Sequence, residues 1–265
     1  MLTLALDTAT KWGRFALARD GELLAYRPLN VEGSSADALL PVVLDILAET
    51  GCRQQDLDTV AVTTGPGSFT GVRIGVATAK GLAWGLGSRL VAVTSLAAMA
   101  AALFEEKPDA PFAVPVLDAR RGEVFCGVFV RDGGWAREEV PVAAARPADW
   151  GSRVLAAVDD PDRPVYGGDG TGLLLGQGAD LRPELAGRGE PVQRAWSSAH
   201  PATARAMALA ASALPEVHPF TLVPDYMRVS DAEVKKKIDL TPHEPGTDVS
   251  SHRSEGPGTA RGPER

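Results

Sequence analysis

The chain has 265 residues, of which 45% are hydrophobic and 23% are charged, and its formal net charge is −7. This composition is typical of a folded globular protein, and the length exceeds the about 100 to 150 residues of one domain, so we expect two lobes. The acidic balance argues against a broad surface for nucleic acid, which needs clustered lysines and arginines. We therefore expect any RNA to be held mainly by a partner.

Features that would mark a zinc site, a signal peptide or a membrane segment are missing from the sequence. Cys52 and Cys126 lie far apart and form no CxxC or Cys/His cluster, so we expect reduced, buried thiols. The first residues have no basic region, and Asp7 interrupts the first apolar run, unlike a signal peptide. No run reaches the roughly 18 apolar residues of a membrane span. These features predict a cytoplasmic protein.

The first part of the chain alternates between strand and helix patterns. Apolar runs bounded by turn residues predict strands at residues 2–6, 13–19, 22–26, 59–64 and 90–93. Apolar residues at three- and four-residue spacing predict helices at residues 35–49, 72–86 and 96–104. The dipeptide Asp20-Gly21 predicts a hairpin, and Thr94 is a candidate helix cap. Charge and proline at 105–109 predict a lobe boundary after residue 108.

The second part restarts a strand, turn, strand pattern. Strands are expected at 112–117, 123–130 and 164–166, whereas the remainder of 143–191 has only weak periodicity. We therefore expect a first lobe at 1–108, a second lobe at 109–197 and a final helix at about 198–214 that returns to the first lobe. An extended segment is expected at 215–240. Residues 241–265 have almost no large apolar side chain, which predicts a disordered tail.

A glycine-rich loop separates the predicted strand at 59–64 from the predicted helix at 72–86. Its residues are Gly65, Pro66, Gly67, Ser68, Phe69, Thr70 and Gly71. Backbone amides at such a place can hold an anion. A P-loop is excluded because Val72 and Arg73 stand where Lys and Ser/Thr are required, and the glycine spacing differs from GxGxxG. Two interpretations stay open: a binding loop, or a tight turn that allows close approach of the helix.

The whole string GPGSFTGVRIG at 65–75, followed by AKGLA at 79–83, closely resembles the signature of the TsaB family, also called YeaZ. Other matching segments occur in order at residues 6–10 (LDTAT), 39–41 (LLP), 93–96 (VTSL), 118–124 (DARRGEV) and 226–228 (YMR). The resemblance covers about residues 1–230 and is weak between roughly 143 and 195.

The resemblance implies an α/β protein with the two-lobed actin-like ATPase fold (ASKHA, ribonuclease H-like) and a reduced second lobe. It also implies a non-catalytic subunit of the bacterial machinery that makes threonylcarbamoyladenosine on tRNA. Such a subunit would pair with its paralogue TsaD, which carries out the transfer to the adenosine beside the anticodon. The ATPase TsaE and a second copy of this chain are further implied partners, and tRNA would be contacted only through the complex.

The segment Asp7-Thr8-Ala9-Thr10 resembles the first phosphate motif of the actin and hexokinase-like ATPases. Asp7, Thr8 and Thr10 are therefore candidate nucleotide contacts, as is Gly168, although a glycine-rich surface turn is the simpler interpretation for Gly168. The second phosphate motif is replaced by Asp118-Ala119-Arg120, which brings positive charge where an aspartate would hold magnesium. No cofactor is expected to be required, and ATP or ADP would sit at an interface shared with the partner. An autonomous ATPase remains the alternative.

A metallopeptidase-like enzyme is a weaker alternative. The four histidines are His200, His218, His243 and His252, and none forms a pair at helical spacing that could hold a metal. No GxSxG elbow surrounds any serine. We therefore assign no catalytic residue and no metal ligand.

The predicted helices at 35–49 and 72–86 are the candidate partner interface. The second helix is apolar over more of its surface than a one-sided contact requires, which is typical of helices that also meet a partner. The family resemblance implies that both helices build this interface. Its expected residues are Leu40, Val43, Leu47, Ile74 and Ala77 for packing, with Arg73 and Lys80 as polar contacts.

Overall fold

The computed structural model describes residues 1–30, 38–158, 164–176 and 202–227. Its first sheet has five strands in the order β3-β2-β1-β4-β5. They are β1 (Leu2–Asp7), β2 (Trp12–Arg19), β3 (Glu22–Asn30), β4 (Thr59–Thr63) and β5 (Arg89–Val93). Strands β1, β2 and β3 form an antiparallel meander, whereas β4 runs parallel to β1 and β5 parallel to β4.

The second sheet repeats this plan with one strand fewer, in the order β8-β7-β6-β9. Its strands are β6 (Phe112–Arg120), β7 (Glu123–Asp132), β8 (Trp135–Ala145) and β9 (Pro164–Gly167). Strands β6, β7 and β8 form the antiparallel meander, and β9 runs parallel to β6. The repeat confirms the predicted two-lobed actin-like fold with a reduced second lobe.

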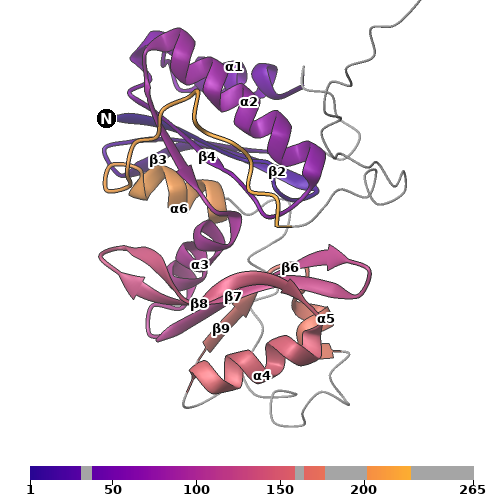
Figure 1. Cartoon of the computed structure of the whole chain (residues 1–265). Coiled ribbons are helices and arrows are strands. Elements are labelled where there is room, and N and C mark those ends of the chain that lie inside the picture. The colour runs from indigo at the N-terminus through magenta and orange to yellow at the C-terminus, as the bar shows by residue number, and fades with distance from the viewer. Residues whose placement is uncertain (31–37, 159–163, 177–201, 228–265) are drawn as a thin grey trace, which may run out of the picture. The chain divides into compact units, whose positions relative to one another are not determined.

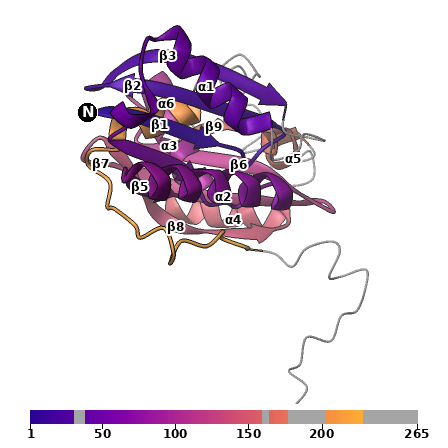
Figure 2. The same cartoon turned by 90° about the horizontal axis from the view of Figure 1, so that it is seen from above.

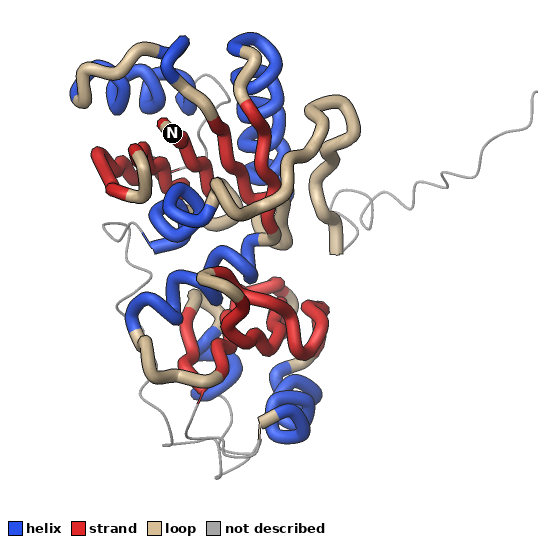
Figure 3. Tube along the Cα trace, turned by 90° about the vertical axis from the view of Figure 1, so that its left-hand side faces the viewer, coloured by secondary structure: helices blue, strands red, loops and turns tan. Residues whose placement is uncertain are grey.

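Helices cover both faces of each sheet (Figures 1 and 3). They are α1 (Leu39–Glu49), α2 (Phe69–Leu86), α3 (Ser95–Glu106), α4 (Pro147–Ala157), α5 (Thr171–Gly176) and α6 (Ala202–Ala210). Helices α1 and α2 lie over one face of the first sheet (Figure 2), and α6 packs on the other. Helix α3 packs on the second sheet and against α6, while α4 and α5 cover the opposite face. No helix in these described ranges is long and apolar enough to cross a membrane.

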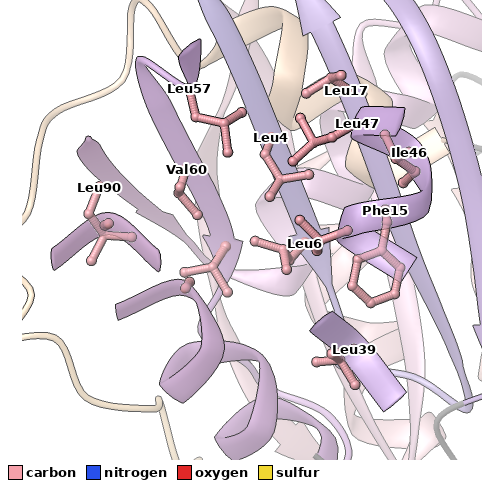
Figure 4. Close-up of a cluster of buried hydrophobic side chains, with 14 of the residues drawn as sticks. Leu4, Leu6, Phe15, Leu17, Leu39, Ile46, Leu47, Leu57, Val60 and Leu90 are labelled. Atoms are coloured by element: carbon pink, nitrogen blue, oxygen red, sulfur yellow. The ribbon is translucent and has the colours of Figure 1, made fainter. Parts of the chain in front are cut away.

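Strand β1 shows how the sequence directs these layers. Leu4 and Leu6 join the large apolar side chains under α1 and α2 (Figure 4), whereas Ala5 and Asp7 face α6. Successive side chains of a strand point to opposite faces, so the alternation of large and small residues selects which helix layer comes close. Burial of each leucine contributes roughly 1.5 to 3 kcal/mol. The small residues on the other face allow α6 to approach the sheet.

Most predicted elements agree with the structure to within a few residues. The Asp20-Gly21 hairpin is confirmed, with φ of 50° and 85° at its two residues, as a tight primed turn requires. Thr94 caps α3, because its side chain accepts a hydrogen bond from the amide of Ala97 at 3.2 Å. Helix α2 starts three residues earlier than predicted, since Ser68 is its cap.

Helix α4 was not predicted, because its turns bury few residues. Trp150 and Val154 point into the core, and Pro147 opens the helix. Helix α3 precedes the proposed boundary at residue 108, yet its buried residues pack in the core of the second sheet. The predicted first turn of the helix at 35–49, His200, and the extended and disordered segments beyond 227 lie outside the described residues.

Residues 215–227, termed the C-terminal strap, return along β5 and α2. The amide of Val217 donates to the carbonyl of Leu90 at 2.8 Å, and Leu222 is buried in the first core. The amide of Asp225 donates to the carbonyl of Thr64 at 2.7 Å. The strap therefore joins the edge strand to the start of the glycine loop.

Candidate functional site

The glycine loop packs directly on the turn between β1 and β2. A Cβ atom added at Gly67 would lie 2.2 Å from the carbonyl oxygen of Ala9, and one at Gly71 would lie 2.2 Å from that of Thr8. At Gly75 the added atom would lie 2.1 Å from Thr8 Oγ1. Real Cβ contacts are essentially never below 3.0 Å. Each glycine is therefore required for the close approach of the loop and α2 to this turn.

Hydrogen bonds within the chain already engage the polar groups where the glycine loop meets the turn between β1 and β2. The amide of Ser68 donates to the carbonyl of Ala9 at 2.6 Å, and the amide of Gly71 donates to Ser68 Oγ at 3.3 Å. Thr8 Oγ1 donates to the carbonyl of Gly71 at 2.8 Å. This geometry favours the structural interpretation of the loop over a phosphate cradle. The expected nucleotide contact at Thr8 is wrong, because its side chain is fully buried against α2.

Asp7 is the centre of a buried polar cluster. Its Oδ1 accepts hydrogen bonds from Thr63 Oγ1 at 3.0 Å and from the amide of Ala9 at 3.2 Å. Its Oδ2 accepts a hydrogen bond from Thr203 Oγ1 and lies 3.5 Å from Arg14 Nη1. The carboxylate is only 2% exposed. Groups from β2, β4 and α6 thus satisfy both of its oxygens.

Arg14 is a functional candidate that the sequence analysis missed. It is 3% exposed, and its Nη1 also donates to Thr10 Oγ1 at 3.0 Å and to the carbonyl of Trp12 at 3.1 Å. Arginine is almost never fully buried unless it is paired. An arginine inside the apolar run Gly13–Arg19 was therefore a signal that an acidic partner lies on the neighbouring strand.

Beside this cluster, a cavity of about 170 Å³ opens between the two lobes. Residues of the β1–β2 segment, including Asp7, Thr10 and Arg14, line it from the first lobe, and Gly168 and Asp169 line it from the second. Ligand pockets usually measure about 300 to 1,000 Å³. In this arrangement the cavity is therefore too small for a nucleotide.

On the second-lobe side of the cavity, the described residues offer one carboxyl, that of Asp169. The segment Asp118-Ala119-Arg120, which replaces the second phosphate motif, forms a turn in which the amide of Arg120 donates to Asp118 Oδ1 at 2.7 Å. The amide of Asp118 donates to Asp169 Oδ1 at 2.9 Å. Magnesium needs carboxylate oxygens in open octahedral geometry. Because Asp7 is held by Arg14 and Asp118 by its own turn, the residues do not fit a magnesium–nucleotide complex.

Asp169 keeps a solvent-exposed part, yet burial of its carboxyl raises its pKa above the usual 3.8. The amide of Asp118 acts in the opposite direction, and Arg14 also lowers the pKa. Gly168 lines the cavity, and the nucleotide contact expected there stays a prediction, because its own conformation explains the glycine. Its φ is +120°, and an added Cβ would lie 2.0 Å from the carbonyl oxygen of Val116. Within the described ranges, no group of three or more histidines, cysteines or carboxylates could hold a metal ion.

The outer faces of α1 and α2 form a second candidate site, termed the outer helix face. It comprises Leu40, Leu44, Ala77, Gly81 and Trp84. Leu40, Leu44 and Trp84 are 45%, 39% and 62% exposed. Large exposed apolar side chains gathered on adjoining helices are typical of a protein–protein contact.

Two of the residues expected at this face lie elsewhere. Val43 is fully buried and Leu47 is 3% exposed, and both pack in the first core (Figure 4 shows Leu47). The expectation was wrong because α1 turns its Leu39, Val43, Ile46 and Leu47 stripe toward the sheet. Leu40 and Leu44 occupy the opposite side. Ile74 is half-buried and packs against the same core.

The two expected polar contacts are both engaged with the C-terminal strap. Arg73 places its guanidinium carbon 3.7 Å from the centroid of the Phe69 ring, and its Nε donates to the hydroxyl of Tyr226 at 2.6 Å. Lys80 Nζ donates to the carbonyl of Leu222 at 2.9 Å. Arg73 is exposed and can also reach a partner, whereas Lys80 is half-buried and primarily fixes the strap.

Comparison with known proteins identifies the family. The chain is 32% identical over 240 residues to the tRNA threonylcarbamoyladenosine biosynthesis protein TsaB of Bacillus subtilis, which covers 89% of this chain and 97% of that protein. The chain belongs to the TsaB (YeaZ) family. The Escherichia coli TsaB is 40% identical over 141 residues, covering 52% of this chain and 60% of that protein.

Solved structures of this family agree with the fold. The structure of YeaZ from Pseudomonas aeruginosa superposes with a TM-score of 0.67 at 28% identity, covering 85% of this chain and 99% of that chain. Residues 27–152 also match the family described as TsaD, tRNA N6-adenosine threonylcarbamoyltransferase. The TsaB membership expected from GPGSFTGVRIG is confirmed, and its kinship with the TsaD family is visible in the same part of the chain.

Proposed function

We propose that this chain is a non-catalytic subunit of the machinery that makes threonylcarbamoyladenosine on tRNA, and that it binds and supports TsaD. The Bacillus subtilis relative named for this biosynthesis covers 89% of this chain. The observation that carries the binding role is the outer helix face, where Leu40 and Leu44 of α1 and Trp84 of α2 are exposed and Trp84 packs on Phe220 of the C-terminal strap. Such a surface has no use in an isolated soluble lobe.

Two glycines of α2 support this assignment. A Cβ atom added at Gly81 or Gly85 would meet no atom within 4 Å, so neither glycine is required for packing inside the chain. Glycine within a helix costs about 1 kcal/mol relative to alanine. Small exposed residues such as Ala77 and Gly81 let another helix come close, with exposed Leu40, Leu44 and Trp84 as anchors.

The polar cluster beside the interlobe cavity supports the proposal that this chain catalyses no reaction by itself. The Asp7 carboxylate is satisfied by three side chains and an amide, so it has no open position for magnesium. Chemistry therefore belongs to the partner, and the role of this chain is to stabilise one arrangement of TsaD by binding it better than the others. ATP or ADP, where required, binds at an interface shared with the partner.

The acidic net charge fits a chain that meets tRNA only through its complex. TsaE is a further partner in this proposal. A second copy of the chain would use the same outer helix face, because a two-fold dimer buries one patch against itself. Self-association and TsaD binding are therefore expected to compete.

A charge placed in the outer helix face tests the binding role. Ala77→Glu puts a carboxylate on this face, where Ala77 is exposed, and we expect it to abolish co-purification with TsaD. Ala156→Glu is the matched control, since Ala156 is also an exposed alanine of a helix but lies on α4 of the second lobe. Equal recovery of TsaD with both variants would contradict the proposed surface.

Reconstitution tests the non-catalytic role. Modification of tRNA by TsaD and the remaining components is expected to require this chain, while the purified chain alone hydrolyses no ATP. ATP turnover by the chain alone that is lost in Asp7→Ala would instead support the autonomous ATPase. Metal-dependent peptide cleavage abolished by a chelator would support the peptidase.

A further inference from the structure

The interlobe cavity contains buried polar atoms that the chain itself does not satisfy. Arg14 Nε and Ser95 Oγ have no hydrogen-bond partner within the described part of the chain, although Arg14 and Ser95 are only 3% and 2% exposed. Both residues line the cavity. A buried polar group without a partner is costly, and native structures usually satisfy it with a ligand or ordered water.

The size of the cavity restricts the ligand. A cavity of about 150 Å³ holds a molecule of the size of benzene, and this one measures about 170 Å³. A ligand of six to eight non-hydrogen atoms is therefore accommodated, whereas a nucleotide is not. Met99 and Leu117 supply apolar walls, so part of the ligand can be aliphatic.

The charges around the cavity restrict it further. Arg14 and Lys11 bring positive charge from the first lobe, and Asp169 brings a carboxyl from the second. Asp7 is already paired with Arg14. A ligand with one anionic and one cationic end matches this arrangement, because each end meets a group of opposite charge and the whole molecule stays neutral.

We propose that the interlobe cavity binds a small zwitterionic α-amino acid, with its carboxylate toward Arg14 and Ser95 and its ammonium toward Asp169. The ligand joins groups from both lobes and α3. It therefore stabilises one relative arrangement of the lobes. The proposal is independent of partner binding, because the cavity and the outer helix face share no residue.

Ligand-observed NMR and calorimetric titration of the full chain test this proposal. L-alanine and L-serine are expected to bind saturably. L-lactate, which replaces the ammonium of alanine by a hydroxyl, is expected to bind at least tenfold more weakly, because it loses the charge-assisted contact with Asp169. Lactate binding as tight as that of alanine, or no binding of either amino acid, would overturn the proposal.

Variants locate the site. Asp169→Asn and Ser95→Ala are each expected to weaken amino-acid binding, by about tenfold and about threefold, respectively. Asp132→Asn is the control, since it removes an exposed carboxylate on the β7–β8 hairpin away from the cavity. Thermal melting shows whether each variant is folded. Unchanged affinity in a folded Asp169→Asn variant, or displacement of the amino acid by AMP, would overturn the assignment.

Discussion

The two faces of α2 use the same residue type for different purposes. On the inner face, Gly71 and Gly75 touch Thr8 so closely that no side chain fits. On the outer face, Gly81 and Gly85 have open space around them. The inner glycines are explained entirely by packing within the chain, whereas the outer ones have no such explanation. The difference suggests a division within α2 between a face fixed by internal packing and the face that we propose for a partner.

The largest effect is expected at the polar cluster beneath the inner face. Asp7→Ala leaves Arg14 buried without its carboxylate, and removal of one partner of a buried pair typically costs about 3 to 5 kcal/mol. Urea unfolding measures this loss. Asp118→Ala, at an exposed turn, is the control and is expected to cost far less. A loss below about 1 kcal/mol for Asp7→Ala would show that the polar cluster does not stabilise the contact between α2 and the β1–β2 turn.

A methyl group on the inner face should have the next largest effect. In Gly75→Ala the new Cβ collides with Thr8 Oγ1, and the resulting overpacking is expected to cost about 1 to 3 kcal/mol despite the better helix propensity of alanine. Thermal or urea unfolding of the isolated chain provides the measurement. An increase in stability would mean that α2 moves freely away from the β1–β2 turn.

The same substitution on the outer face should have the opposite sign. Gly81→Ala adds a Cβ to open space, so we expect the isolated chain to gain up to about 1 kcal/mol. The comparison with Gly75→Ala removes the contribution of propensity, because both sites lie inside α2. A loss of stability comparable to that of Gly75→Ala would contradict the distinction between the two faces.

The smallest effect concerns the second lobe, which contributes Asp169 to the cavity. Burial raises the pKa of this carboxyl in the folded chain, so its ionised form is less stable there than in the unfolded chain. Its contribution to stability is fully present below the usual pKa of 3.8 and is lost as the pH rises through the folded pKa. Asp169→Asn should therefore slightly raise Tm at pH 7.

That advantage should shrink as the pH falls through the folded pKa and disappear below 3.8, where the wild-type carboxyl is protonated in both states. Melting curves of the two proteins across this range give the measurement. An advantage of the asparagine variant that grows on acidification would contradict the direction of the pKa shift.

Much of the fold followed from local patterns, because most strands and helices bury a regular stripe. The Asp20-Gly21 hairpin and the Thr94 cap are examples in which a few residues determine a turn or a helix end. Helix α4 was missed, since its core contact rests mainly on Trp150 and Val154. The repeat of strand order in the second lobe depends on pairing between distant segments, which periodicity does not reveal.

The sites were less predictable for the same reason. The sequence indicated that α1 is amphipathic, but it could not say that Val43 faces the sheet while Leu44 faces outward, because that depends on how the helix is rotated. The pairing of Arg14 with Asp7 joins neighbouring strands, and the Thr203 contact comes from a helix nearly 200 positions later. Such contacts arise only when the chain is folded.

The affinity of TsaD for a Gly81→Gln variant tests the central claim most directly. Glutamine is a good helix former, so the isolated chain should fold at least as stably as the wild type, while its side chain occupies the open space beside Gly81. Gly172→Gln on α5 is the control, because its Cβ also meets open space but lies on the second lobe. We predict at least tenfold weaker binding of TsaD to Gly81→Gln and unchanged binding to Gly172→Gln. Unchanged affinity of a folded Gly81→Gln protein would contradict the account.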